Sequence, residues 1–274
     1  MFELDTKQLN EKGFVLVRSL FQKQEIEKVR NDAKEVFLIQ LRRRGILRSG
    51  NPSEEEFERA LFSYFDQHLA EFMNCGKQIQ HLLSLHRLSL DERIESALKQ
   101  VGLDRPNIST RPVLYFNSKF LAREEVYWRV FPHQDWRSMQ GSLDSIVVWL
   151  PLTDVDLKLG ALEVVPGSHR MGLLTSEVKN SFGKVDAFCD DDFVSVEALQ
   201  GDGLFFSAFL VHRSGENVTR SIRWSCHFRY NNLSERTFIE RGFPHAYFYK
   251  PQDELITPEF PQPESLVELF ARTD

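Results

Sequence analysis

The sequence predicts a mainly β fold, a sandwich or barrel, preceded by a layer of helices. From residue 105 to about 235, short apolar segments alternate with turn residues, which is typical of antiparallel sheets. The first 104 residues instead carry apolar side chains at three- and four-residue steps, which indicates amphipathic helices. We therefore expect one domain over residues 1–274, in which 236–274 is an extension and a candidate lid.

The N-terminal layer is expected to open with a short strand at 13–17 and then continue as helices. A helix is predicted over about 24–44, because its apolar residues fall on one stripe. Ser53 and Glu56 match a capping box, so a second helix is expected to begin there and to carry its apolar stripe to Phe72. The stretch 77–101 has a helical pattern in two pieces.

Six β segments are expected after the helical layer, separated by turn clusters such as Pro166-Gly167-Ser168 and Gly201-Asp202-Gly203. They are 113–117, 126–131, 145–150, 162–165, 203–209 and 222–230.

Charge and composition limit the kind of partner. The chain has 34 basic and 40 acidic residues, and its net charge of −6 argues against nucleic acid and anionic membrane surfaces. No apolar run approaches the ~18 residues of a membrane span, and no secretory signal is seen. Three cysteines cannot pair completely, which favours reduced thiols. These observations predict a cytoplasmic protein with a small-molecule partner and leave its oligomeric state open.

The sharpest local motif is His133-Gln134-Asp135, placed where a β segment ends. Residues i and i+2 of an extended chain point to the same side, so the imidazole and the carboxylate can reach one metal ion together. The motif is weak alone, since the composition predicts about one such H-x-D/E triplet by chance.

A third ligand is available in His212, which follows the segment 203–210. Two histidines and one carboxylate with the other positions open form the facial triad of non-haem Fe(II) oxygenases. Arg223 lies 11 residues after His212, at the start of the next β segment. A buried arginine there can bind a dicarboxylate with two parallel hydrogen bonds.

These residues resemble the phytanoyl-CoA dioxygenase family of Fe(II)/2-oxoglutarate oxygenases. The resemblance is carried by H-x-S-G-x-N-x-T-x-x-x-R from His212 to Arg223, by the H-Q-D triplet, and by the run from Gly160 to His169. It covers about residues 10–235 and implies a double-stranded β-helix (jelly roll) flanked by helices.

The resemblance also implies roles for single residues. His133, Asp135 and His212 would be the catalytic iron ligands. Arg223 would bind the C5 carboxylate of 2-oxoglutarate, with the Ser214 hydroxyl beside it. Two further residues, Trp149 and Leu114, would line the cosubstrate pocket. The candidate contacts to the substrate are Trp136, Arg137 and His227, together with Arg111 or Arg129.

The implied reaction uses Fe(II), 2-oxoglutarate and O2. It hydroxylates an unactivated C–H of a small metabolite, natural-product precursor or acyl- or carrier-linked substrate, and releases succinate and CO2. Two alternatives are a cupin-type metal dioxygenase without 2-oxoglutarate, which would not need Arg223, and a non-enzymatic jelly-roll binding module. Purely structural roles also remain alternatives for three residues. Trp149 could be a core residue, Ser214 could cap a turn, and Arg137 could be a solvated loop residue.

Alternation along the last β segment makes a further prediction. If Arg223 points into the barrel, then Ser225, His227 and Arg229 share its face, while Trp224, Cys226 and Phe228 face the helices. A bulge between Arg223 and His227 would reverse this pattern.

Overall fold

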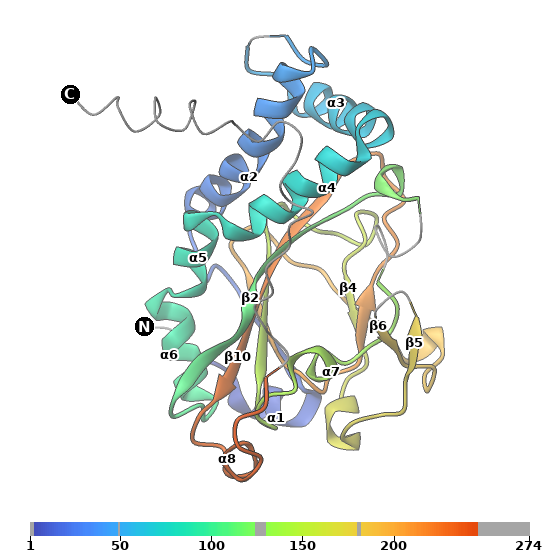
Figure 1. The fold of residues 1–274 in the computed structure, drawn as a ribbon. Helices are drawn as coiled ribbons and strands as arrows, with labels where there is room; N and C mark the ends of the chain where they lie inside the picture. The colour runs from blue at the N-terminus through green and yellow to red at the C-terminus, as the bar shows by residue number, and fades with distance from the viewer. Residues whose placement is uncertain (1–2, 49, 124–129, 180–181, 246–274) are drawn as a thin grey trace, which may run out of the picture.

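The computed structural model describes residues 3–48, 50–123, 130–179 and 182–245, and Figure 1 shows its helices and strands. The helices are α1 (Thr6–Lys12), α2 (Lys23–Arg43), α3 (Glu54–Gln67), α4 (Leu69–Gln78), α5 (Leu83–Ser89), α6 (Glu92–Gln100), α7 (Trp136–Met139) and α8 (Arg236–Glu240), with short 3-10 turns between some of them. The strands are β1 (Phe14–Val17), β2 (Pro106–Asn117), β3 (Ile146–Pro151), β4 (Leu162–Val164), β5 (Glu177–Lys179), β6 (Phe182–Lys184), β7 (Val194–Val196), β8 (Gly203–Ser207), β9 (His212–Ser214) and β10 (Arg223–Asn232).

The larger sheet has five strands in the order β1-β8-β3-β10-β2, and every neighbouring pair is antiparallel. The strand β10 lies between β2 and β3, which places the residues from Arg223 onward well inside the sheet. A smaller sheet has the order β7-β4-β9, and β5 and β6 form a two-stranded ribbon. An isolated bridge between His133 and His212 brings the chain before α7 next to β9.

The two sheets face each other across one of the hydrophobic clusters. Trp149 and Phe206 enter it from the larger sheet, and Leu162 and Val164 enter it from the smaller sheet. Two facing antiparallel sheets with helices outside are the jelly-roll architecture that the sequence resemblance implied. The expected fold class is therefore confirmed.

The helical layer covers the outer face of the larger sheet. Figure 1 shows α2 and α4 to α6 along one side of β2 and β10, with β4 to β6 on the other side. Trp224, Cys226 and Phe228 of β10 belong to the same buried cluster as Phe37 of α2 and Leu85 of α5. The apolar residues of β10 therefore face the helices, as alternation predicted.

Several expected elements differ in extent from the observed ones. The capping box at Ser53 and Glu56 is present, but the helix that follows ends at Gln67. His68 adopts φ −136° and ψ 50°, and α4 starts after it, so the single apolar stripe belongs to two helices. The short strands β5, β6, β7 and β9 were not predicted, because three-residue segments carry too little alternation to be read.

Two expected segments fall largely outside the described residues. They are the β segment 126–131, of which 126–129 is not described, and the extension 236–274, of which only the part up to residue 245 is described. Within the described part of the chain, no helix is long and apolar enough to cross a membrane.

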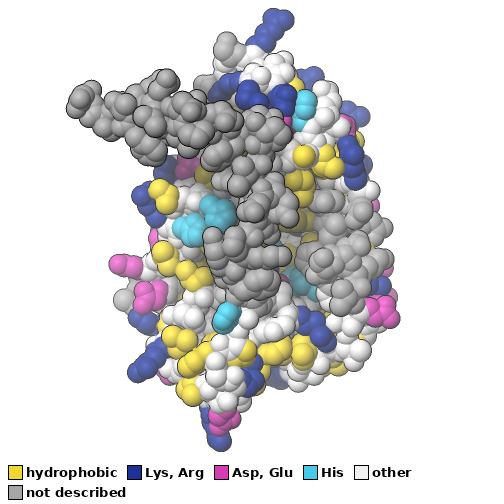
Figure 2. Space-filling view, in the orientation of Figure 1, with side chains coloured by type: hydrophobic (Ala, Val, Ile, Leu, Met, Phe, Trp, Pro, Cys, Tyr) yellow, Lys and Arg dark blue, Asp and Glu magenta, His cyan; other side chains and the backbone are white. Residues whose placement is uncertain are grey.

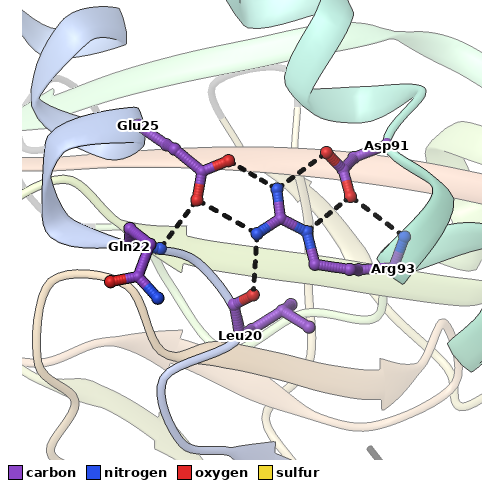
Figure 3. A network of polar contacts seen from close by, with 5 residues as sticks. All are labelled: Leu20, Gln22, Glu25, Asp91 and Arg93. Carbon is purple, nitrogen blue, oxygen red and sulfur yellow. Dashed lines mark hydrogen bonds and ion pairs between the residues drawn. The ribbon is translucent and has the colours of Figure 1, made fainter. Parts of the chain in front are cut away.

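A polar network ties the start of α2 to the start of α6 (Figure 3). The Arg93 guanidinium donates to Glu25 Oε1 at 2.6 Å and to Asp91 Oδ1 at 2.7 Å, and Glu25 Oε2 accepts from the backbone N–H of Gln22 at 2.8 Å. Arg93 also lies 4.2 Å from the centre of the Phe21 ring. The network therefore holds the N-terminal ends of α2 and α6 together within the helical layer.

Arg93→Met is expected to lower the free energy of unfolding by about 1–2 kcal/mol, because hydrogen bonds to charged groups are lost from a partly exposed site. Chemical denaturation of the variant beside the wild-type protein measures this loss. A variant as stable as the wild-type protein would mean that the network contributes nothing to the layer.

Candidate active site

Three side chains from two segments meet at one end of the space between the sheets. His133 and Asp135 come from the chain before α7, and His212 opens β9. One ligand atom from each lies within 4.8 Å of the other two, and His133 Nε2 is 3.7 Å from Asp135 Oδ1. The backbones of His133 and His212 are joined by two hydrogen bonds of 3.0 and 3.1 Å, which fix their spacing.

Each histidine ring is oriented by the backbone carbonyl group two residues before it. Nδ1 of His133 lies 2.8 Å from the carbonyl oxygen of Phe131, and Nδ1 of His212 lies 3.0 Å from that of Leu210. A carbonyl oxygen only accepts, so each Nδ1 is the protonated nitrogen and each Nε2 keeps its lone pair for a metal. Burial lowers the pKa of His212 to about 3, so His212 is neutral at pH 7.

The Asp135 carboxylate is almost completely buried and has a cationic partner. Arg229 Nη2 of β10 donates to Asp135 Oδ1 at 3.0 Å. Burial alone would raise the pKa of Asp135, but the charge of the Arg229 guanidinium beside it holds that pKa well below its usual range. Oδ2 has no hydrogen-bond partner among the described residues. A buried anionic oxygen without a donor fits a bound cation.

The middle residue of the triplet points elsewhere. Gln134 is buried, and its amide nitrogen donates to the carbonyls of Phe209 at 2.7 Å and Gly172 at 2.8 Å. Its amide oxygen accepts from the backbone N–H of Leu174 at 2.9 Å. Gln134 therefore fastens the chain on which His133 and Asp135 lie, as side-chain alternation requires.

Arg223 is the buried cation of the site, and only 1% of it is exposed. Its guanidinium donates to the carbonyl oxygen of Gly160, and Nη2 lies 3.3 Å from Ser214 Oγ. Among the described residues, Nε of Arg223 has no hydrogen-bond partner and no carboxylate forms an ion pair with Arg223. Burial lowers the pKa of Arg223 to about 10, so it keeps its charge at pH 7. A buried, unneutralised guanidinium is costly and fits a bound carboxylate.

Hydrogen bonds of Asn217 and Thr219, the N-x-T part of the motif, stabilise the loop between His212 and Arg223. Asn217 donates to the carbonyl oxygens of Asn117 at 3.1 Å and Ser221 at 2.9 Å, and its own oxygen accepts from Thr219 Oγ1 at 2.7 Å. Gly160 has φ +83°, and a Cβ there would lie 2.7 Å from the carbonyl oxygen of Gly215. Only glycine allows this close approach, which brings the Gly160 carbonyl to Arg223.

One cavity lies between the two histidines of the triad and Arg223. Its described walls are Val113 and Tyr115 of β2, Val130, His133, Leu162 of β4, His212 to Ser214 of β9, and Arg223, His227 and Arg229 of β10. Burial raises the pKa of Tyr115 to about 12, so the phenol is neutral beside Arg223 at pH 7. The cavity therefore presents one buried positive charge, that of Arg223, beside the two histidines of the triad.

Two further residues were predicted to lie in this cavity, and both line it. Ser214 contacts Arg223, and His227 shares the inner face of β10 with Arg223 and Arg229. The register shifts between β10 and β2 come only after His227, so no bulge reverses the pattern before it. The predicted alternation along β10 is confirmed.

The expected pocket position of Leu114 is corrected by the structure. Leu114 is paired with Cys226, and both belong to the buried cluster under the helices. Its neighbours Val113 and Tyr115 line the cavity instead. Adjacent residues of a strand face opposite sides, so Leu114 cannot share a wall with them.

The remaining expected contacts lie outside the described walls of the cavity. Trp149 is fully buried in the cluster between the sheets. Trp136 stacks on Phe209 with ring centres 5.2 Å apart, and Arg137 donates to the carbonyl oxygen of Leu174. The helix α7 begins directly after Asp135, and this change of backbone direction turns both side chains away.

The structure does not place Arg111 or Arg129, the other two arginines expected near the substrate, at the cavity. Arg111 is exposed and lies along β2 in a separate groove beside α4. Arg129 lies outside the described residues. The structure instead adds Val113, Tyr115 and Leu162 to the cavity, and alternation along β2 was the signal that could have identified the first two.

His227 gives the site a measurable pH signature. Burial, then the nearby charge of Arg229, holds the pKa of His227 well below its usual range, and neither ring nitrogen has a partner among the described residues. In the unfolded chain a histidine takes up a proton below about pH 6.5. As the pH falls from 7 to 5, the unfolded state is therefore stabilised by about 2 kcal/mol for each such histidine.

We expect the metal-free wild-type protein to lose about 2 kcal/mol more unfolding free energy between pH 7 and pH 5 than His227→Gln loses. Urea denaturation in the presence of a chelator measures both losses. Equal losses in the two proteins would show that His227 is not neutral in the folded state.

Comparison with known proteins gives the chain its family. A model of the phytanoyl-CoA dioxygenase (PhyH) family matches residues 9–225, which is most of the chain. The chain belongs to the phytanoyl-CoA dioxygenase family. The match includes His133, Asp135, His212 and Arg223, and it ends inside β10.

Curated members of the family are similar over part of their length. A phytanoyl-CoA dioxygenase of Arabidopsis thaliana is 29% identical over 119 residues, covering 41% of this chain and 42% of the plant protein. Phytanoyl-CoA dioxygenase 1 of Oryza sativa subsp. japonica is 29% identical over 115 residues, covering 40% and 41%. The matched part of the chain thus spans about two-fifths of these relatives.

Solved structures share the fold at lower identity. The non-haem alpha-ketoglutarate-dependent carbocyclase SnoK from nogalamycin biosynthesis has a TM-score of 0.54 and 16% identity, with 90% of this chain and 92% of SnoK covered. EctD from S. alaskensis, solved with 2-oxoglutarate and 5-hydroxyectoine, has a TM-score of 0.52 and 16% identity, with 85% and 76% covered. These likenesses establish the fold that the family match implies.

Proposed function

We propose that the protein is an Fe(II)- and 2-oxoglutarate-dependent oxygenase that hydroxylates a small molecule and releases succinate and CO2. The observation that carries the proposal is the shared cavity: His133 and His212 of the His-Asp-His cluster line the same space as a buried arginine that has no carboxylate partner among the described residues. The family match supports the same reaction, as do solved structures of this fold that hold its cofactors: the epimerase SnoN with Fe3+ and alpha-ketoglutarate, and EctD with 2-oxoglutarate.

The proposed iron ligands are His133, Asp135 and His212. Their donor set fits Fe(II), because two neutral imidazoles and one carboxylate leave the other coordination positions open. Iron would supply the activation of O2 for attack on a C–H bond. The protein contributes the fixed imidazole tautomers and the buried carboxylate, which need no rearrangement to accept a cation.

The proposed partner of Arg223 is the C5 carboxylate of 2-oxoglutarate, with Ser214 beside it. Arg223 is charged and donates from a fixed position, since Gly160 and Ser214 already hold its terminal nitrogens. A bound carboxylate would neutralise this buried charge. Trp149 is proposed to act only through packing between the sheets, beside His227, with which it is paired across β3 and β10.

The proposed substrate is a small metabolite, a natural-product precursor or an acyl- or carrier-linked molecule, and His227 is the described residue proposed to contact it. On the face seen in Figure 2, Lys and Arg side chains are scattered and do not form one continuous patch in its described part, which supports a small-molecule partner over nucleic acid. We also propose a cytoplasmic location, supported by three free cysteines, two of them buried.

The test is a screen of small metabolites, in each class proposed, for substrate-dependent formation of succinate from 2-oxoglutarate. Succinate should form only when Fe(II), O2 and a substrate are all present, and the hydroxylated product should appear in equal amount. Product formation that proceeds at the same rate without 2-oxoglutarate would favour a cupin-type dioxygenase and overturn the proposal.

A further inference from the structure

Arg229 contacts the site without belonging to the expected ligand set. It lies on β10, six residues after Arg223, and its Nη2 donates to Asp135 Oδ1 at 3.0 Å. Only 14% of the Arg229 side chain and 3% of the Asp135 side chain are exposed. Since the two residues are 94 positions apart in the chain, the pair ties β10, between β3 and β2 of the larger sheet, to the loop that carries His133 and Asp135.

The pairing of β10 with β2 is irregular at Arg229. The register between β10 and β2 shifts on both sides of Arg229, between His227 and Arg229 and again between Arg229 and Tyr230. On the opposite edge, Arg229 keeps its regular pairing with Val147 of β3. Bulges of this kind occur beside active sites, where they redirect one side chain.

Two other partly buried arginines pair with carboxylates that are not candidate metal ligands. Arg213 binds Glu163 and Asp190, and Arg93 binds Glu25 and Asp91. Arg229 differs because its carboxylate partner is a candidate metal ligand, and because its Nε has no hydrogen-bond partner among the described residues. A single donor on Oδ1 leaves the remaining lone pairs of the carboxylate available to a cation.

We propose that Arg229 is a positioning residue that holds the Asp135 carboxylate in its metal-binding orientation. The inference rests on the proposed function, since it assumes a metal at the triad. Without Arg229, the buried carboxylate would lack a partner and would turn away from the cavity or lose its charge, and either change competes with metal binding. Partners of metal ligands of this kind commonly contribute 10- to 100-fold to metal affinity.

The experiment is a titration of the metal-free protein with Co(II), followed by calorimetry and by visible absorption. We expect Arg229→Met to bind Co(II) about 10- to 100-fold more weakly than the wild-type protein and to alter the Co(II) absorption spectrum. Arg229→Lys should lie between the two, because it keeps the charge but not the planar fork. Arg93→Met is the matched control: it should lose stability and keep the wild-type Co(II) affinity and spectrum.

Each outcome decides the inference. Unchanged or tighter Co(II) binding with an unchanged spectrum in Arg229→Met, beside a wild-type protein that binds the metal, overturns this inference alone. A wild-type protein that binds no Co(II) overturns the proposed function together with it. If Arg229→Met does not fold, Arg229→Lys decides, and wild-type affinity and spectrum in that variant overturn the inference.

Discussion

His212→Ala is expected to abolish metal-dependent turnover, with a loss of more than about two orders of magnitude in metal affinity. Replacing a mere partner of a metal ligand costs about 10- to 100-fold, and His212 is one of only three protein ligands proposed here. His133→Ala and Asp135→Ala should have the same effect. Iron content after reconstitution, with oxygen consumption in the presence of 2-oxoglutarate, measures both losses.

The matched control is a histidine outside the cavity. His81 is exposed and stacks on His86, far from the triad in the helical layer, so His81→Ala should keep wild-type iron content and turnover. Full oxygen-dependent turnover by any one of the three triad variants would overturn the assignment of the metal ligands.

Arg223→Ala is expected to retain iron and to weaken 2-oxoglutarate binding by about 30-fold to several thousand-fold. Removing one partner of a buried charge pair costs roughly 2–5 kcal/mol, which corresponds to that range of affinity. Lysine at this position should rescue binding only in part, because one ammonium cannot reach both Ser214 and a carboxylate as a planar fork does. Calorimetry with the Mn(II)-loaded protein measures the affinity.

A second arginine that lines the cavity, on the smaller sheet, provides the control. Arg213 lines the cavity, but Glu163 and Asp190 already neutralise its charge. Arg213→Ala should therefore change 2-oxoglutarate affinity far less than Arg223→Ala does. Equal affinities in the wild-type protein and Arg223→Ala would remove Arg223 from the cosubstrate site.

Much of the site could be predicted because strand geometry has a short, strict period. Once Arg223 was placed inside the barrel, alternation placed His227 and Arg229 beside it. The same rule would have corrected Leu114, since it is paired with Cys226 and paired residues face the same side. That correction needs the register between two strands, which the sequence of a single strand does not contain.

Other features depend on contacts that no local pattern encodes. The pair of Arg229 and Asp135 joins residues 94 positions apart, and it forms only when the sheets close. The break at His68 carries no glycine or proline signal, so two helices were predicted as one. Trp136 and Arg137 lie next to Asp135 in sequence, but the start of α7 turns them away from the cavity.

If one cavity holds iron and 2-oxoglutarate together, the visible spectrum of the oxygen-free protein should report it. Adding Fe(II) and 2-oxoglutarate to the wild-type protein should produce a weak charge-transfer band that neither produces alone. The band should be absent in Asp135→Ala, and in Arg223→Ala it should appear only at much higher 2-oxoglutarate concentration. A wild-type protein that binds Fe(II) but shows no band at any concentration of 2-oxoglutarate would contradict the account.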